Sequence, residues 1–483
     1  MQRVIVIGAG LGGLECAYIL AKNGLQVTVL EQDAHIGGCL QTFRRGEVLF
    51  DSGFHYVGGL REGESLYPLF RYFGLLDLPW QLLDEEAFDE VVIGGQSYPF
   101  AMGHERFVES LLPYFPQAKE ELQRYVAVLR HTGEHIADAF MPHDSTDYIA
   151  SSALSRSAYE FLCQTISDPL LRRVLSGTSI KMELNADTLP LYVFAQINNS
   201  FMQSAWRLRG GGQQITDRLA SSVVRMGGEV RTQTLVTAIE QRSDATLVHT
   251  ANGDTYEADW VICNIHPVSA VRLMSGNAAI KPVYQHRLER LQNTFGMFTA
   301  NIRLKPDALP YINHNLFVHS GDADLWNPDT SVPQSVMVSF YAGQPAVDLL
   351  TPMRWQQVER WADTKAGRRG DDYVGMKRQV VEDCLRLVER RLPDLRGAID
   401  RVYTSTPLTY CRFTLTPYGS AYGIRKDWRS PLTTVLSPRT PLPRVLLTGQ
   451  NLTLHGILGV SMTSVLTAAE ILGMPAILQQ IKY

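Results

Sequence analysis

The amino-acid sequence predicts an α/β protein built around a doubly wound sheet, and the evidence lies in its first forty residues. Residues 4–7 are a β-branched run typical of a buried strand, and they lead directly into Gly8-Ala9-Gly10-Leu11-Gly12-Gly13. Apolar residues then recur at helical spacing as far as Gly24, which is suited to ending a helix. A second apolar strand, residues 27–30, ends in Glu31. This order of strand, glycine turn, helix, strand and acid predicts a Rossmann-type dinucleotide site.

Each part of this unit has a physical reason. Gly8 permits the tight turn, Gly10 lets a pyrophosphate approach the backbone, and Gly13 lets helix and strand pack closely. The start of the helix offers free N–H groups and a positive dipole to the phosphates. Glu31 can accept hydrogen bonds from ribose hydroxyls. A glycine pattern alone is usually only a loop, but here every neighbouring element stands where a dinucleotide needs it.

Composition narrows the function classes. At 483 residues the chain is long enough for two or three domains, and 45% hydrophobic with 19% charged residues is ordinary for a globular protein. A formal charge of −4 provides no basic footprint, so no nucleic-acid partner is expected. The six cysteines are scattered without a C-x-x-C pair, which argues against a disulfide framework or a metal site and favours a reducing compartment. We therefore expect a cytoplasmic protein without a bound metal.

Two segments bear on whether the chain carries a targeting signal or a membrane span. The chain opens directly on a core strand and Glu15 interrupts the apolar stretch that follows, so no signal peptide is expected. Residues 445–469 carry no formal charge apart from any proton on His455 and are long enough to span a bilayer. They also contain Gln450, Asn451, several threonines and three glycines, which favours a cofactor loop and helix over a membrane span.

The middle of the chain predicts a second, mixed domain. Residues 60–200 are rich in leucine and aromatic side chains, with a hairpin near Gly94-Gly95. Helical segments are predicted at 104–113, 117–140 and 156–176, strands at 298–304, 316–319 and 336–341, and a charged helix at 376–391. The nucleotide fold resumes after the glycine run 210–212 with a helix to Gly227 and strands at 229–231, 234–239, 246–250 and 259–264. That run follows Arg207-Leu208-Arg209 rather than a buried strand, so a separate nicotinamide domain is not expected.

Four further motifs resemble a known family. They are Gly37-Gly38 with Thr42 four residues later, Asp51-Ser52-Gly53-Phe54-His55-Tyr56, the segment 418–423, and Gly449-Gln450 followed by Gly456-Ile457-Leu458-Gly459. Together with the N-terminal unit they resemble the flavoproteins that include phytoene desaturases, carotenoid isomerases and retinol saturases. The segment from Asp51 to Tyr56 is most similar to the retinol saturase branch.

The resemblance implies a glutathione-reductase-like fold with FAD as the cofactor. It places a discontinuous FAD-binding domain at 1–60, 200–280 and 400–483, and an inserted mixed α+β substrate-binding domain at 60–200 and 280–400. By family analogy Val236 touches the adenine with its backbone, and the helix start after Gly456 faces the pyrimidine side of the flavin. Many relatives carry a basic or small residue directly after the glycine pair, whereas this sequence has Cys39 there. The expected cofactor-binding residues are Gly8, Ala9, Gly10, Leu11, Gly12, Gly13, Glu31, Gln32, Gly37, Gly38, Cys39, Thr42, Val236, Gly449, Gln450, Leu458, Gly459 and Val460.

The expected chemistry requires a proton donor beside the flavin. If an alkene is saturated, hydride goes to one carbon and an acid must protonate the other. His55, Tyr56 and His455 are the candidate catalytic residues because they lie in motifs that approach the ring, although a lone histidine is more often structural. Tyr410, Tyr418 and Tyr422 are weaker candidates, since tyrosines there usually pack or line a site. An isomerase would use the same residues.

The expected function is that of an FAD-dependent oxidoreductase that saturates, desaturates or isomerises carbon–carbon double bonds of a polyene, isoprenoid or retinoid-like apolar substrate. Two alternatives stay open. One is a non-catalytic lipid-binding escort on the same fold, which would have no need of all the glycine motifs together. The other is an amine oxidase, although the segment 449–459 shows neither a cysteine for covalent attachment nor an aromatic cage. The electron donor or acceptor is open, and relatives of this kind often touch membranes, so peripheral association at the inner face is a further hypothesis.

Overall fold

The centre of the fold is a five-stranded parallel sheet. The structure, a computed structural model, describes residues 1–134 and 153–481. The strand order is β10-β2-β1-β14-β20, and every neighbouring pair is parallel. The strands are β1 (Arg3–Ile7), β2 (Gln26–Leu30), β10 (Glu229–Arg231), β14 (Trp260–Cys263) and β20 (Val445–Leu447). The sequence therefore folds into the predicted nucleotide sheet from three separated parts of the chain.

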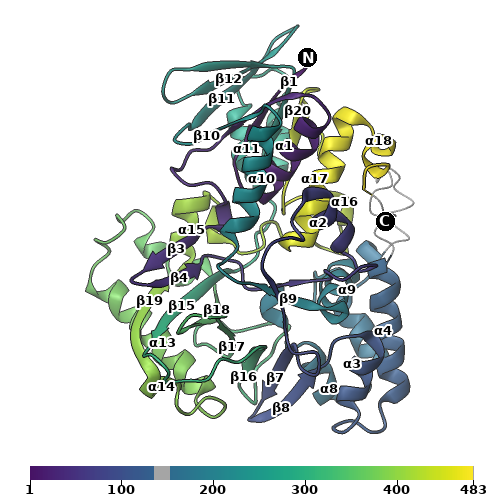
Figure 1. Cartoon of the computed structure of the whole chain (residues 1–483), viewed down its shortest axis with the longest axis vertical. Helices are drawn as coiled ribbons and strands as arrows, with labels where there is room; N and C mark the ends of the chain where they lie inside the picture. The colour runs from purple at the N-terminus through teal and green to yellow at the C-terminus, as the bar shows by residue number, and fades with distance from the viewer. Residues whose placement is uncertain (135–152, 482–483) are drawn as a thin grey trace.

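This sheet is covered on both faces, as its all-apolar strands require. Val4 and Val6 pack into the core beneath three helices, whereas Ile5 and Ile7 point into a separate core on the other face. The three helices are α1 (Leu11–Lys22), α10 (Gln213–Arg225) and α17 (Gly456–Leu472), and α1 contacts both of the others (Figure 1). The opposite face carries β11 (Val236–Gln241), β12 (Thr246–Thr250), β13 (Thr255–Ala258) and α11 (Pro267–Leu273).

A seven-stranded mixed sheet forms the other half of the molecule. Its order is β19-β15-β18-β17-β16-β7-β8, with β16 and β7 parallel and all other neighbours antiparallel. The strands are β7 (Asp89–Ile93), β8 (Gln96–Phe100), β15 (Gly296–Leu304), β16 (Asn315–His319), β17 (Ser335–Phe340), β18 (Ala346–Met353) and β19 (Ile399–Ser405). It joins strands from the two predicted substrate segments, although the domain boundaries themselves stay a prediction.

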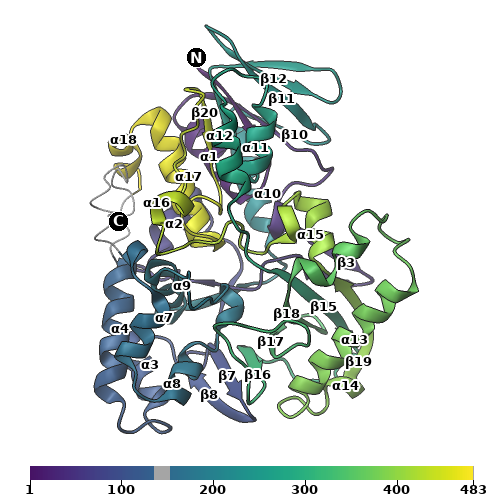
Figure 2. The same cartoon turned by 180° about the vertical axis from the view of Figure 1, so that it is seen from behind.

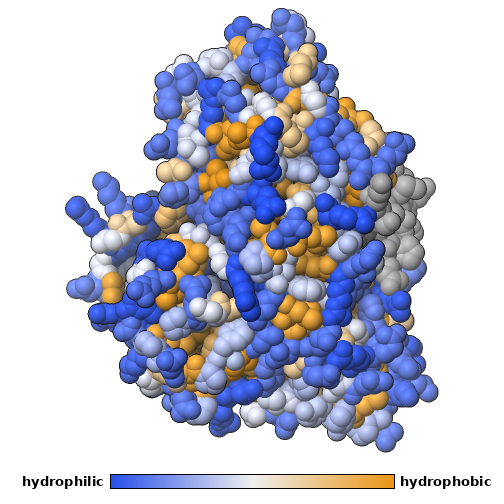
Figure 3. All heavy atoms as spheres, in the orientation of Figure 1, coloured by the Kyte–Doolittle hydropathy of each residue, from blue (hydrophilic) through white to orange (hydrophobic). Residues whose placement is uncertain are grey.

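Helices flank this second sheet at its two sides. On one side lie α3 (His104–Leu111), α4 (Lys119–Glu134), α7 (Ala158–Thr165), α8 (Pro169–Leu175) and α9 (Leu191–Gln203), and on the other α13 (Asp371–Val388) and α14 (Leu395–Ala398) (Figures 1 and 2). Smaller elements are α2 (Tyr67–Phe73), β3 (Thr42–Arg45), β4 (Val48–Asp51), β5 (Val57–Gly58), β6 (Trp80–Leu82), β9 (Ala205–Leu208), α12 (Pro282–Glu289), α15 (Pro407–Thr414), α16 (Pro431–Thr434) and α18 (Met474–Leu478). The surface facing the viewer in Figure 3 is mostly hydrophilic with scattered hydrophobic patches.

Several predicted elements need correction. The helix predicted at 156–176 is two helices, because Asp168 caps α8 by accepting hydrogen bonds from the N–H groups of Leu170 and Leu171, and Pro169 opens it. The helix predicted at 376–391 begins earlier, at Asp371, and the end of the predicted helix 117–140 lies outside the described residues. Strands β18 and β19 were not predicted.

The stretch before the second glycine run was also misjudged. Residues 205–208 do form a largely buried strand, β9, in which the side chain of Arg207 is buried and donates a hydrogen bond to Asn315 at 2.8 Å. β9 belongs to a small antiparallel sheet with β5 and β6, not to a parallel nucleotide unit. No helix among the described residues is long and apolar enough to cross a membrane.

Candidate active site

The glycine turn after β1 forms a cradle that side chains would fill. Gly8 has φ +96°, and a Cβ added there would lie 2.8 Å from the backbone oxygen of Asn264. A Cβ on Gly13 would lie 2.1 Å from the backbone oxygen of Gly8. Gly10 has an extended backbone immediately before α1 and lines a cavity. The turn therefore leaves the N-terminus of α1 open to a phosphate group, which fits the dinucleotide prediction.

Glu31 follows β2 and connects the turn to the cavity. Its carboxylate accepts hydrogen bonds from the backbone N–H groups of Ala9 at 2.8 Å and Asp33 at 3.0 Å. Burial raises the pKa of this carboxyl, and these two hydrogen bonds work against that shift. Glu31 and Gln32 both line the cavity. The acid thus holds the glycine turn while facing the space where a ribose would lie.

The second glycine pair packs against the first turn. Gly37 donates its N–H to the oxygen of Ala9 at 2.9 Å, and both Gly37 and Gly38 have positive φ. The next residue, Cys39, lines the cavity. Thr42 does not: it pairs with Asp51 across the β3–β4 hairpin, outside the cavity wall.

The C-terminal motif closes the cradle from the other side. Gly449 has φ +94° after β20, and α17 begins at Gly456. A Cβ on Gly459 would lie 2.4 Å from the backbone oxygen of Leu454, so this glycine allows the close entry into α17. The predicted residues that line the cavity are Gly8, Gly10, Leu11, Gly12, Glu31, Gln32, Gly37, Gly38, Cys39, Val236, Gly449, Gln450, Leu458 and Val460, while Ala9, Gly13, Thr42 and Gly459 stand behind it.

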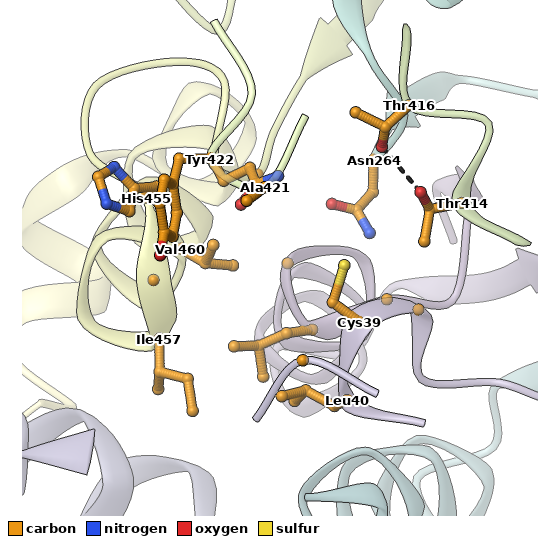
Figure 4. A pocket seen from close by; sticks show the side chains of 18 of the residues that line it. Cys39, Leu40, Asn264, Thr414, Thr416, Ala421, Tyr422, His455, Ile457 and Val460 are labelled. Atoms are coloured by element: carbon orange, nitrogen blue, oxygen red, sulfur yellow. Dashed lines mark hydrogen bonds between the residues drawn. The ribbon is translucent and has the colours of Figure 1, made fainter. Parts of the chain in front are cut away.

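Asn264 is a central residue that sequence reasoning did not assign. It follows β14, the strand next to β1, and its Nδ2 donates to the oxygen of Gly8 at 3.3 Å. Its Oδ1 lies 2.9 Å and 2.8 Å from where a Cβ on Gly12 or Gly449 would stand. Figure 4 shows its side chain opposite Tyr422, His455 and Ile457 across the pocket. Its position at the carboxyl end of a parallel strand was the available signal.

The cavity continues from this cradle towards the second sheet. Its volume is about 580 Å³, within the usual range for a small-molecule site. Apolar side chains line its inner part: Leu66, Ile180, Ile197, Phe201, Met297, Met337 and Leu350. Tyr410 and Tyr422 also line it, and their hydroxyls donate to the backbone oxygens of Ser52 and Ile180. Tyr418 lies outside the cavity wall.

The three predicted catalytic side chains all face this cavity. His455 Nε2 lies 3.2 Å from the backbone oxygen of Lys181, and His55 Nδ1 lies 3.8 Å from an oxygen of Asp348. Burial lowers the pKa of each histidine to about 4, so both imidazoles are neutral at pH 7. Tyr56 donates its hydroxyl to Asp89 at 2.9 Å, and burial raises its pKa. Neutral imidazoles can accept a proton, but they are poor proton donors.

A buried pair of acids behind His55 was also missed. Asp51 accepts the N–H of Gly212 at 2.7 Å, and Asp348 on β18 accepts the hydroxyl of Tyr341 at 2.6 Å. Burial raises the pKa of Asp51 to about 8 and that of Asp348 to about 7. In the sequence Asp51 stands out only as part of a motif, and Asp348 lies in a strand that was not predicted. No group of three or more His, Cys, Asp or Glu side chains in the described ranges is placed to hold a metal ion.

Comparison with known proteins identifies the class that this fold and site define. Residues 11–293 match the family described as flavin containing amine oxidoreductases, and the chain belongs to that family. A crystal structure of an oxidoreductase from Methanosarcina mazei superposes with a TM-score of 0.63 at 16% identity, covering 96% of this chain and 99% of that one. The fold class is thereby confirmed, and the protein is an FAD-dependent oxidoreductase.

Sequence relatives belong to the predicted branch and to the wider family around it. Human all-trans-retinol 13,14-reductase is 26% identical over 520 aligned positions, covering 97% of this chain and 85% of the relative. The phytoene desaturase (lycopene-forming) of Pseudescherichia vulneris is 23% identical and covers 88% of this chain and 89% of the relative. The resemblance to the retinol saturase and desaturase flavoproteins is confirmed.

Proposed function

We propose that this protein saturates, desaturates or isomerises carbon–carbon double bonds of an extended apolar substrate of the polyene or isoprenoid class. The observation that carries the proposal is that the dinucleotide cradle and an apolar region lie in one continuous cavity, whose total volume is about 580 Å³. Apolar walls favour a substrate that gives up little hydration on entry. The names of the relatives, a retinol reductase and a phytoene desaturase, support the same substrate class.

The chain's own residues take the following parts in this proposal. The glycines of the two N-terminal motifs and the start of α17 hold the cofactor, with Glu31 accepting ribose hydroxyls. Bound FAD supplies hydride transfer at carbon. His55, Tyr56 and His455 contact the substrate from the cavity wall. Because both imidazoles are neutral at pH 7, they suit proton acceptance during desaturation better than proton donation.

Product analysis tests the proposal. The FAD-loaded protein is incubated without oxygen, once oxidised and once reduced with dithionite, with a set of polyenes and a set of primary amines. A polyene that gains or loses two hydrogen atoms, or changes isomer, supports the proposal. Conversion of amines to aldehydes with all polyenes unchanged would identify an amine oxidase instead. Tight polyene binding without any conversion in either redox state would identify a lipid-binding escort.

We also propose peripheral contact with a membrane through the rim of the cavity. Phe413 and Leu415 line the cavity and are 45% and 52% exposed, and Tyr418 beside them is 56% exposed. Exposed apolar side chains at the mouth of an apolar cavity suit collection of a membrane-dissolved substrate. Flotation with lipid vesicles should recover the protein in the vesicle fraction, and Phe413→Ser with Leu415→Ser should reduce that fraction. Absence of the native protein from the vesicles would refute the contact.

A further inference from the structure

A buried ion pair lies on the wall of the apolar cavity. Lys181, at the end of a short 3₁₀ turn of residues 179–181, places its Nζ 2.7 Å from Oδ2 of Asp89 at the start of β7. Their side chains are 5% and 0% exposed. Lys181 lines the cavity, whereas Asp89 lies behind it. Neither residue was singled out from the sequence, because nothing in the local pattern distinguishes them from surface charges.

The carboxylate of this pair has further hydrogen-bond partners besides the ammonium. Asp89 also accepts the hydroxyl of Tyr56 at 2.9 Å and the Nδ2 of Asn315 at 3.2 Å. Asn315 in turn accepts a hydrogen bond from Arg207 at 2.8 Å. Three segments distant from Asp89 in the sequence, those of Tyr56, Arg207 and Asn315, thus fix the position of the acid, and the acid fixes the position of the ammonium.

The ammonium, in contrast, has unused donors. A lysine ammonium carries three N–H groups, and Asp89 is the one oxygen acceptor that it contacts among residues 1–134 and 153–481. Aromatic faces surround the rest of it, with the Phe201 ring centroid 4.3 Å and the Tyr56 centroid 5.5 Å from Nζ. These rings stabilise the cation but accept no strong hydrogen bond. The remaining donor capacity is available to a molecule in the cavity.

A second buried lysine, in contrast, has all of its hydrogen-bond donors satisfied within the protein. Lys426 donates to the backbone oxygens of Thr434, Asn451 and Leu452 at 2.8, 2.6 and 2.9 Å, and it does not line the cavity. All three of its donors are used within the protein. Lys181 is not arranged this way. Since a buried ion pair contributes little to stability compared with apolar side chains of the same volume, stability alone does not account for a cation at this wall.

We propose that Lys181 binds an oxygen atom of the substrate, so that the substrate is an apolar chain bearing a hydroxyl, carbonyl or carboxylate group rather than a pure hydrocarbon. This inference rests on the proposed function, because it assumes an apolar chain in the cavity. The ammonium holds the oxygen by a charge-assisted hydrogen bond. The oxygen-bearing part of the chain then lies against Phe201 and Tyr56, which fixes how far the double bonds extend along the cavity.

Binding measurements on the FAD-loaded protein test this assignment. The probes are three polyenes that share one conjugated chain and end in a hydroxyl, a carboxylate or a methyl group, and the dissociation constants come from the change in polyene absorption. We expect the two oxygen-bearing polyenes to bind roughly 10- to 100-fold more tightly than the hydrocarbon, as a hydrogen bond to a charged group allows. Equal affinity of the native protein for all three would overturn the inference, and this comparison requires no variant.

A matched pair of variants assigns the preference to Lys181. Lys181→Met with Asp89→Asn removes both charges together, which avoids leaving an unpaired buried acid, and should abolish the preference. The control, Arg391→Met with Glu90→Gln, removes the ion pair formed by the next residue of β7 with Arg391. Neither residue of that pair lines the cavity, so the control should retain the preference for oxygen-bearing polyenes. A preference that survives in the first variant would overturn the assignment. Failure of all three polyenes to bind the native protein would instead reject the proposed function.

Discussion

Two substitutions in the glycine turn should separate cofactor binding from folding. Gly10 has φ −76° and ψ 177°, a conformation that alanine adopts without strain. A Cβ there meets only Asn264 Nδ2, at 3.1 Å, so that side chain must move by a few tenths of an ångström. The cost is offset by the ~0.4–1 kcal/mol that Gly→Ala gains from the unfolded chain. The apoprotein of Gly10→Ala should therefore unfold at nearly the native temperature.

The same methyl group occupies the space that a pyrophosphate needs. We expect the affinity of Gly10→Ala for FAD to fall by at least about tenfold, which is ~1.4 kcal/mol. Gly13→Ala behaves differently, because its Cβ would lie 2.1 Å from the backbone oxygen of Gly8 and the turn itself must shift. Overpacking of this kind costs ~1–3 kcal/mol, so Gly13→Ala should lower the unfolding temperature of the apoprotein as well.

The assay combines thermal unfolding of the two apoproteins with titration of FAD, in which binding is monitored by the quenching of flavin fluorescence. Gly10→Ala should fail only in the titration, and Gly13→Ala in both measurements. A Gly10→Ala protein that binds FAD as tightly as the native protein in this titration would refute the placement of the pyrophosphate at this turn.

Three further predictions concern buried polar groups. Burial raises the pKa of Asp348 to about 7, from about 4 in the unfolded chain. The folded state therefore retains the proton over that pH interval after the unfolded state has lost it. The free energy of unfolding should decline as the pH rises through the interval, and this group contributes up to ~1.4 kcal/mol per pH unit. Asp348→Asn should flatten that decline in urea titrations, and an unchanged slope would contradict the buried neutral acid. Burial likewise raises the pKa of Glu15 to about 8, although Ser461 donates a hydrogen bond to it at 2.6 Å. Because this carboxyl is then largely neutral at pH 7, Glu15→Gln should shift the urea midpoint very little. A large decrease of the midpoint would show that the carboxylate charge is needed. Ser461→Ala removes that donor and should cost ~1 kcal/mol, measured by the same midpoint.

The nucleotide half of the fold could be predicted because its signals are local. The strand of residues 4–7, the glycine turn and Glu31 each have a short-range reason for their residue type, and the structure places them together as predicted. The C-terminal motif was found in the same way, since Gly449 and Gly459 stand where a side chain would collide with the backbone or with Asn264. Glycines that are required because two backbone segments approach closely can therefore be recognised in the sequence.

The substrate side was harder to predict because its residues meet only through tertiary structure. Lys181, Asp89 and Asp348 lie on a 3₁₀ turn and two strands, far apart in the sequence, and each looks locally like an ordinary surface charge. Their burial comes from strand pairing that single-sequence patterns do not encode. The role of each predicted site residue stays a prediction, even where the structure places its side chain at the cavity wall.

The central claim is that the cradle and the apolar cavity form one reaction site. The most direct measurement is to mix the reduced and the oxidised FAD-loaded protein with polyenes in the absence of oxygen and to monitor the redox state of the flavin by its visible absorption. We predict that at least one polyene either restores the oxidised flavin spectrum of the reduced protein, with one product that has gained two hydrogen atoms for each flavin reoxidised, or bleaches the spectrum of the oxidised protein, with one product that has lost two hydrogen atoms for each flavin reduced. If dioxygen alone reoxidises the flavin, and oxidised protein leaves every polyene unchanged while converting an amine, the cavity does not serve the chemistry assigned to it.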